Sequence, residues 1–211
     1  MSPRQQNALR PVAELDALRP AQRKRAVFLP ALAPFPRHTW PLVALLPVLG
    51  INDALRQAIA ARRPFRAAPP IAGLFACDPF LRISDMAAAL HKAGIAQVVN
   101  WPTVQVFEGE TAAALAAVGY RAEAEFRLLA RMAEHGIAPI ACATSPHAVD
   151  AALALGLWRI LLHPGLARPA DHAAWWAALA GHVAIEGGEA LAWDDRALLP
   201  QISRPSRRIR L

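Results

Sequence analysis

The stretches IAGLFACDPF (residues 71–80) and QVVNWPTVQVFEG (residues 97–109) decide the fold. Each begins as a short apolar run, which is typical of a strand buried on both faces. Each run then breaks at a polar residue, Asp78 in the first stretch and Asn100 in the second. The two stretches therefore predict buried strands that carry polar side chains at their carboxyl ends.

Two further runs, IACATSP (residues 140–146) and RILLHPG (residues 159–165), repeat this pattern. The helical patterns between the runs end at Gly94, Gly136 and Gly156, and an apolar residue follows each glycine. Glycine adopts the left-handed conformation that closes a helix at little steric cost. Repeats of helix, glycine and buried strand indicate βα units on a parallel sheet.

Folds of this kind build their sites at the carboxyl ends of the parallel strands. We therefore predict that the polar residues after the buried strands share one end of the sheet. These residues are Asp78, Asn100, Thr144 and His163.

The rest of the chain extends this core outward. We divide it into a basic N-terminal segment (residues 1–25), a (β/α) barrel-like domain (residues 26–195) and a basic C-terminal tail (residues 196–211). No strand is expected before Ala26, and the pattern indicates about five or six βα units. A complete eight-unit barrel usually needs ~250 residues. The fold class predicted is therefore α/β, a TIM-barrel-like fold whose barrel is incomplete or irregular on its N-terminal side.

Composition sets further limits. Of the 211 residues 55% are hydrophobic and 18% charged, so the chain can bury a substantial core. The net charge of +7 comes largely from arginine-rich ends. We read these ends as solvated tails and expect no nucleic-acid partner, because no recognised binding motif accompanies the charge.

We expect neither a membrane span nor a disulfide. The longest apolar region, residues 26–51, is interrupted by five prolines and lacks ~18 uninterrupted apolar residues. No secretory signal is apparent at the N-terminus. Cys77 and Cys142 are therefore expected to be reduced thiols in a cytoplasmic protein.

The strand-end residues suit acid–base and metal chemistry. The carboxylate of Asp78 can bind Mg²⁺ or orient an enolate, or it can simply cap a turn. Asn100 and Thr103 can hydrogen-bond a substrate carboxylate, or they can tie their loop together. His163 is the candidate for proton transfer, because the pKa of histidine ordinarily lies near neutrality; the alternative is a structural histidine.

The segment after Asn100 adds three more candidates for substrate binding: Glu108 in the loop, and Tyr120 with Glu123, which would share a helix face. The alternatives are a solvated Glu108 and an ordinary surface pair between Glu123 and Arg127. Glu125, two residues beyond Glu123, is expected to point elsewhere.

These motifs resemble the TIM-barrel proteins of the phosphoenolpyruvate-hydrolase-like family, which are related to phosphonopyruvate hydrolases. The resemblance runs from about residue 45 to residue 166. It rests on LLP followed by Asn52, AGLFACDPF, VVNWPTVQVFEG, GYRAEAE and the strand ending LLHPGL. The family also carries a glycine-rich loop after its first strand, and this sequence shows none before Ala26.

The resemblance implies a small pyruvate- or enolpyruvate-type acid as substrate or ligand, and a hydrolase or a C–C or C–P lyase as the class of enzyme. Asp78 and His163 would be catalytic, with Mg²⁺ or Mn²⁺ as a possible cofactor. The absent glycine-rich loop favours the alternative, a non-catalytic ligand-binding or assembly module. Trp175 and Trp176 could cover the open side of the incomplete barrel or form a dimer contact, and we expect a homo-oligomer.

Overall fold

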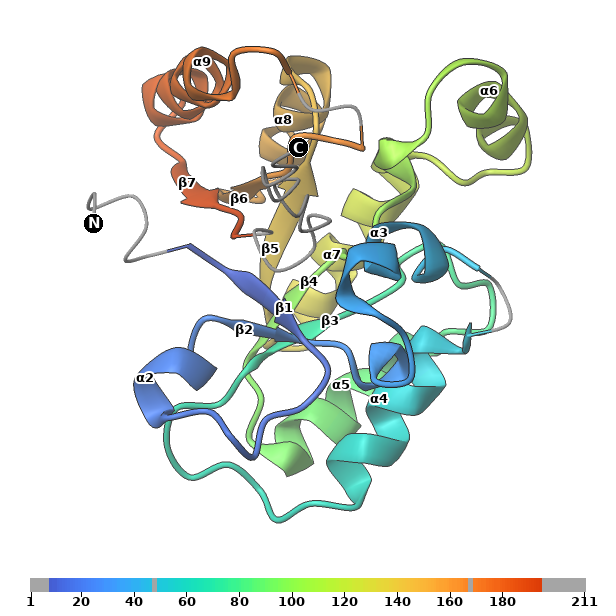
Figure 1. Cartoon of the computed structure of the whole chain (residues 1–211), viewed down its shortest axis with the longest axis vertical. Coiled ribbons are helices and arrows are strands. Elements are labelled where there is room, and N and C mark those ends of the chain that lie inside the picture. Colours follow the sequence, from blue (N-terminus) through green and yellow to red (C-terminus); the bar gives the residue numbers. More distant parts are fainter. Residues whose placement is uncertain (1–7, 47–48, 167–168, 195–211) are drawn as a thin grey trace, which may run out of the picture.

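The computed structural model describes residues 8–46, 49–166 and 169–194. Within them, seven parallel strands run in the order β1 to β7 and curl into a TIM-barrel-like α/β fold (Figure 1). The strands are β1 (Arg10–Val12), β2 (Ala26–Phe28), β3 (Ile71–Gly73), β4 (Gln97–Val99), β5 (Ala138–Ala143), β6 (Arg159–Leu162) and β7 (Glu189–Ala192). The expected fold class is therefore confirmed.

Helices connect the strands. They are α2 (Pro20–Arg23), α3 (Trp40–Val43), α4 (Ile51–Ala60), α5 (Ile83–Ala93), α6 (Gly109–Ala117), α7 (Ala122–Glu134), α8 (Pro146–Leu153) and α9 (His172–Ile185), with short 3-10 turns η1 (Pro30–Leu32), η2 (Arg37–Thr39) and η4 (Val104–Val106). Of these helices, α5, α7, α8 and α9 pack against the outer face of the sheet. In the described part of the chain, no helix combines the length and the apolar character that a bilayer crossing requires.

The expectation of no strand before Ala26 is wrong. Strand β1 pairs in parallel with β2, and Arg10 lies opposite Ala26. A three-residue strand that contains Pro11 has almost no pattern of its own, so only the pairing reveals it. The residues after β1, 13–19, contain no glycine, so no glycine-rich loop follows this strand.

Within the described residues the first and last strands of the seven-stranded sheet meet at a short seam. Leu9 forms a single parallel bridge with Trp193. Its N–H donates to the carbonyl of Ala192 at 2.8 Å, and its carbonyl accepts from the N–H of Asp194 at 2.7 Å. The seam that we expected to be open is therefore tied within the chain at this one point. The C-terminal tail, residues 196–211, lies outside the described residues.

Both faces of the sheet are buried, as the apolar runs predict. One face packs against helices α5, α7, α8 and α9, through Phe28, Ala72, Val98, Ala141 and Ile160. The other face fills the inside of the barrel, through Val27, Ile71, Val99, Ile140, Leu161 and Leu191. Trp40, Trp101 and Trp193 join this inner cluster.

Gly73, at the end of β3, is the tightest point of the inner cluster. A Cβ atom here would lie 2.6 Å from Cδ2 of Leu29 and 2.8 Å from the carbonyl oxygen of Trp101. We expect Gly73→Ala to lower the free energy of unfolding by ~1–3 kcal/mol, because overpacking moves neighbours that cannot yield freely. The measurement is urea unfolding at equilibrium.

Gly181 provides the matched control for this substitution. It lies inside α9, and a Cβ there would meet nothing within 4 Å. Gly181→Ala should raise the free energy of unfolding by ~0.5–1 kcal/mol, because alanine restricts the unfolded chain and favours the helix. If both variants changed stability alike, Gly73 would not be a packing constraint.

Candidate functional site

The polar residues predicted to share one end of the sheet do so. Asp78 follows β3, Asn100 follows β4, Thr144 follows β5 and His163 follows β6, and these strands are parallel. Their side chains, however, do not converge on one open pocket. Asp78, Asn100 and His163 belong to three separate groups, and Oγ1 of Thr144 donates to the carbonyl of Gln105 at 3.4 Å, beside the group of Asn100.

The first group surrounds the fully buried carboxylate of Glu125 on α7. Its Oε2 accepts hydrogen bonds from Nδ2 of Asn100 at 2.9 Å, Oγ1 of Thr103 at 2.7 Å and Nε2 of Gln105 at 2.8 Å. Its Oε1 accepts from the N–H of Val104 at 2.9 Å. One side chain of a helix thus binds the whole loop that follows β4.

Glu125 points into the protein because it lies on the buried face of helix α7. Glu125, Leu129 and Met132 recur at the spacing of one helix face, and all three are buried. The expectation that Glu125 points away from Glu123 was correct in direction, but the carboxylate points into the protein and takes the central role. Glu123 itself is partly exposed and lies 3.7 Å from His147, a pair outside this group.

The side-chain amide of Asn100 hydrogen-bonds to other protein groups through both its oxygen and its nitrogen. Its Oδ1 accepts from the N–H of Cys142 at 2.6 Å, while its Nδ2 donates to Glu125 and, at 3.3 Å, to the carbonyl of Cys142. The side chain therefore links the ends of β4 and β5. Asn100 and Thr103 were candidates for substrate binding, and here they take the alternative role of holding the loop.

Burial and hydrogen bonding have opposite effects on the pKa of Glu125. Burial raises the pKa of Glu125 from 4.5 to about 7, and hydrogen bonds from Thr103, Gln105, Val104 and Asn100 offset part of that rise. Burial, with the nearby Glu125 charge, also raises the pKa of Cys77 to about 12. These two causes likewise raise the pKa of Cys142 well above its ordinary value. Neither thiol is therefore activated as a nucleophile.

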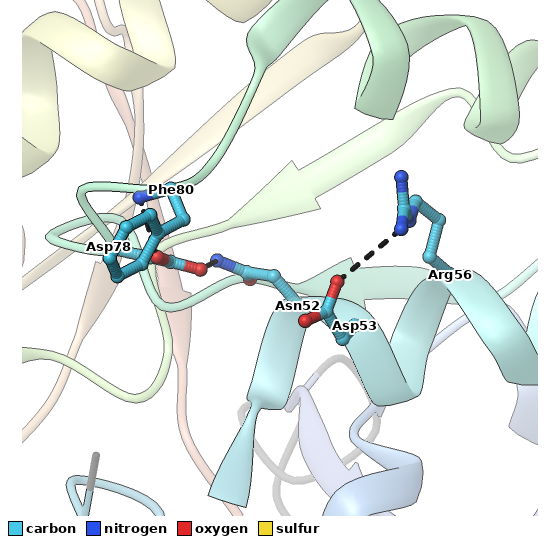
Figure 2. A network of polar contacts seen from close by, with 5 residues as sticks. All are labelled: Asn52, Asp53, Arg56, Asp78 and Phe80. Carbon is cyan, nitrogen blue, oxygen red and sulfur yellow. Dashed lines mark hydrogen bonds and ion pairs between the residues drawn. The ribbon is translucent and has the colours of Figure 1, made fainter. Parts of the chain in front are cut away.

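The second group joins Asp78 to Asn52 on α4, as Figure 2 shows. Oδ2 of Asp78 accepts from Nδ2 of Asn52 at 2.8 Å, and Oδ1 accepts from the N–H of Phe80 at 2.9 Å. Asn52 also exchanges hydrogen bonds with the backbone of Phe75, at 2.9 and 3.1 Å. Asn52 lies in the first turn of α4 and fixes the turn after β3.

A pocket of about 260 Å³ adjoins this pair on the outside of the barrel. Its walls come from the first turns of α4 and α5 and from the turn between β3 and α5. Arg56 pairs with Asp53 there at 3.5 Å (Figure 2). Arg82 and Asp85 complete its charged lining.

The third group encloses His163, which is 3% exposed. The N–H of Gly165 donates to its Nδ1 at 3.1 Å. The imidazole ring packs beside two indoles, with centroid distances of 6.4 Å to Trp101 and 5.7 Å to Trp193; the indoles are 5.1 Å apart, so the three rings form a triangle. The mouth of the barrel is thus packed with aromatic rings around the histidine.

The two remaining candidates lie apart from these groups. Glu108 is exposed at the start of α6. Tyr120 is half-buried and packs edge-on against Phe75, with ring centroids 6.2 Å apart. Neither is hydrogen-bonded to His163, Asp78 or Asn100.

The sequence suggests Mg²⁺ or Mn²⁺ as a possible cofactor, with the carboxylate of Asp78 as a possible ligand. Among the described residues, no three Asp, Glu, His or Cys side chains gather in an arrangement that could hold a metal ion. Both oxygens of Asp78 already accept hydrogen bonds. We therefore route no chemical step through a metal ion.

Fold and site together define a parallel α/β barrel whose strand-end polar groups hydrogen-bond to nearby helices, loops and backbone. The chain belongs to the phosphoenolpyruvate hydrolase-like family, which matches residues 41–179, more than half of the chain. It is also similar to an uncharacterized protein, y4oT, of Sinorhizobium fredii (strain NBRC 101917 / NGR234), with 34% identity over 115 residues. That match covers 54% of this chain and 58% of the length of the relative.

The raised pKa of Glu125 predicts a pH dependence of stability. The folded protein holds a proton that the unfolded chain releases above about pH 4.5, so the free energy of unfolding falls as pH rises from about 4.5 to about 7. We expect wild type to lose about 3 kcal/mol more over this window than Glu125→Gln, which cannot titrate there. Urea unfolding at a series of pH values measures both slopes.

Other titrating groups contribute equally to both proteins, so the difference between the two slopes isolates Glu125. Parallel slopes would mean that Glu125 titrates alike in the folded and unfolded chains. The burial of the carboxyl would then have no net effect on its protonation.

Proposed function

We propose that this protein is a non-catalytic member of the phosphoenolpyruvate hydrolase-like family that acts as an assembly module. The proposal rests on one observation: the polar groups at the strand ends make their contacts within the protein. The donors of Asn100 and Thr103 face Glu125, and His163 is enclosed by Trp101 and Trp193. A substrate at the mouth would have to displace these contacts.

Displacement would be costly. Removing a partner from a buried, hydrogen-bonded carboxylate leaves it unsatisfied, at a cost of ~1–3 kcal/mol or more for each bond. A carboxylate substrate placed beside Glu125 would also bring a like charge into a dry site. The group around Glu125 is therefore better suited to holding the loop than to binding an acid.

The segment after the first strand supports the same proposal. A glycine-rich loop can direct several backbone N–H groups at a phosphoryl group. Residues 13–19, which follow β1, contain no glycine, and they lead to Arg19 and the short helix α2. The chain thus lacks the feature by which the family resemblance would imply phosphoryl binding.

Helix α6 supports assembly. It stands apart from the barrel in Figure 1, and none of its residues is buried. Its sequence is GETAAALAA, and Val118, directly after it, is 71% exposed. An apolar helix without a covering surface is characteristic of an interaction site. We propose a second copy of this chain as the partner, in a reducing compartment such as the cytoplasm, where the buried thiols Cys77 and Cys142 stay free.

A second candidate function is the binding of a small carboxylate at the 260 Å³ pocket beside Asn52 and Asp78. The observation in its favour is Arg82, an exposed guanidinium on the wall of that pocket. Arg56 is already paired with Asp53, so Arg82 would be the main contact for the carboxylate.

The deciding assay for catalysis is phosphate release from phosphoenolpyruvate and from phosphonopyruvate, with Mg²⁺ or Mn²⁺ added. We expect wild type and His163→Ala to remain at the rate of the enzyme-free control. Loss of a single preorganised donor typically costs ~10²–10³ in rate, and here the whole glycine-rich loop is lacking. Turnover by wild type that disappears in His163→Ala would overturn the non-catalytic proposal.

Light scattering of the purified protein tests assembly. We expect wild type to have a mass above that of one chain, and Val118→Asp to shift it toward the monomer, because a charge is expensive to bury in an apolar contact. Ile185→Asp is the control, since Ile185 is 82% exposed at the far end of α9. A monomeric wild type, or equal effects of both substitutions, would contradict a contact through α6.

A further inference from the structure

A second pocket lies at the opposite end of the barrel, where the strands begin. Its volume is about 580 Å³. Its walls come from the segment after β1, from α2, and from the segment that joins the end of α4 to β3. It is lined by Asp16, Arg23, Ala61, Arg62, Arg63, Pro64, Phe65, Arg66 and Ala67.

The lining of this pocket is strongly basic. Four arginines face one aspartate, so the formal charge of the lining is 4 − 1 = +3. Arg62 is paired with Asp16. Arg63 and Arg66 are exposed, and within residues 8–46, 49–166 and 169–194 neither has an ion-pair or hydrogen-bond partner. Two guanidinium groups thus remain available to an anion.

Arg23 is held in position by the pocket floor. Its Nε donates to the carbonyl of Ala68 at 2.9 Å, and its guanidinium lies 5.5 Å from the centroid of the Phe65 ring. The N–H of Phe65 in turn donates to the carbonyl of Ala93 at 2.8 Å, which ties the floor to the end of α5. The terminal nitrogens of Arg23 are therefore presented on a fixed frame, with little side-chain freedom left to lose on binding.

The backbone beneath Arg23 is also unusual. Ala68 has φ +51°, the left-handed conformation that side chains other than glycine rarely adopt. Such residues persist where the surrounding structure holds them, and they gather at ligand sites. Here the holding contact is the hydrogen bond from Arg23 itself.

A purely structural role explains only part of this cluster. Arg62 and Arg63 follow the C-terminus of α4, where positive charge is favoured by the helix dipole. Arg66 lies further along the same segment, beyond the last turn of α4, and Arg23 belongs to α2. Two segments thus bring four positive charges to one pocket, where they repel one another, and a bound anion would relieve this repulsion.

We propose that this pocket binds a small molecule bearing two or more linked phosphoryl groups. Guanidinium groups bind phosphoryl oxygens in bidentate fashion, and linked phosphoryl groups match several arginines at once. The volume lies within the range of small-molecule sites, ~300–1,000 Å³. The site is independent of the barrel mouth and does not depend on the proposed lack of catalysis.

The test is isothermal titration calorimetry of the full chain with inorganic pyrophosphate in low-salt buffer. We expect a Kd below about 1 mM, with inorganic phosphate binding about tenfold more weakly or worse. Arg63→Ala/Arg66→Ala should weaken pyrophosphate binding by about tenfold or more, because two charge-assisted contacts are lost. Both side chains are exposed, so we expect the urea midpoint of the variant to match that of wild type.

The matched control is Arg127→Ala/Arg131→Ala, which removes the same charge from exposed positions on α7. We expect it to change pyrophosphate binding by no more than about twofold. Equal weakening of pyrophosphate binding in both double variants would mean that net charge alone causes the loss, and it would overturn the proposal. So would the absence of pyrophosphate binding, or binding confined to a single-stranded oligonucleotide, which would indicate a surface for nucleic acid.

Discussion

The burial of one carboxylate, that of Glu125, is the constraint on which the barrel mouth depends. A buried acid must have partners, and all four donors around it come from residues 100–105. Meeting this requirement fixes the loop after β4. That loop carries Trp101 into the inner cluster, beside His163 and Trp193 and above Gly73. The closed mouth therefore follows from where α7 places a single side chain.

In this chain, the polar residues of the family motifs mainly hold loops in place. Asn100 joins β4 to β5, and the Asp-Pro-Phe turn is held by Asn52 from a helix that precedes it in sequence. Each oxygen of Asp78, and Oδ1 of Asn100, accepts one hydrogen bond from the protein. A ligand at either residue would have to share or replace these contacts.

The sequence predicted the repeating part of the fold and missed the parts that depend on distant contacts. Glycine-terminated helices and buried apolar runs identified the later strands, because those signals are local. Strand β1 was not predicted because three residues are too few to show a hydrophobic periodicity. Only its pairing with β2 defines it. The inward position of Glu125 was readable from its spacing to Leu129 and Met132. The bond between Asn52 and Asp78 was not, because no local rule joins residues 26 positions apart.

The two ends of the barrel use their charges in opposite ways. At the mouth, polar groups are paired inside the protein, and burial shifts the protonation of Glu125 and both thiols. At the other end, arginines from two segments line a pocket, and only one of the four is paired with an acid. A binding site needs polar groups that can still form hydrogen bonds, because groups already paired within the protein must first be separated from their partners. In this chain that capacity lies where the strands begin, although the fold family usually places it where they end.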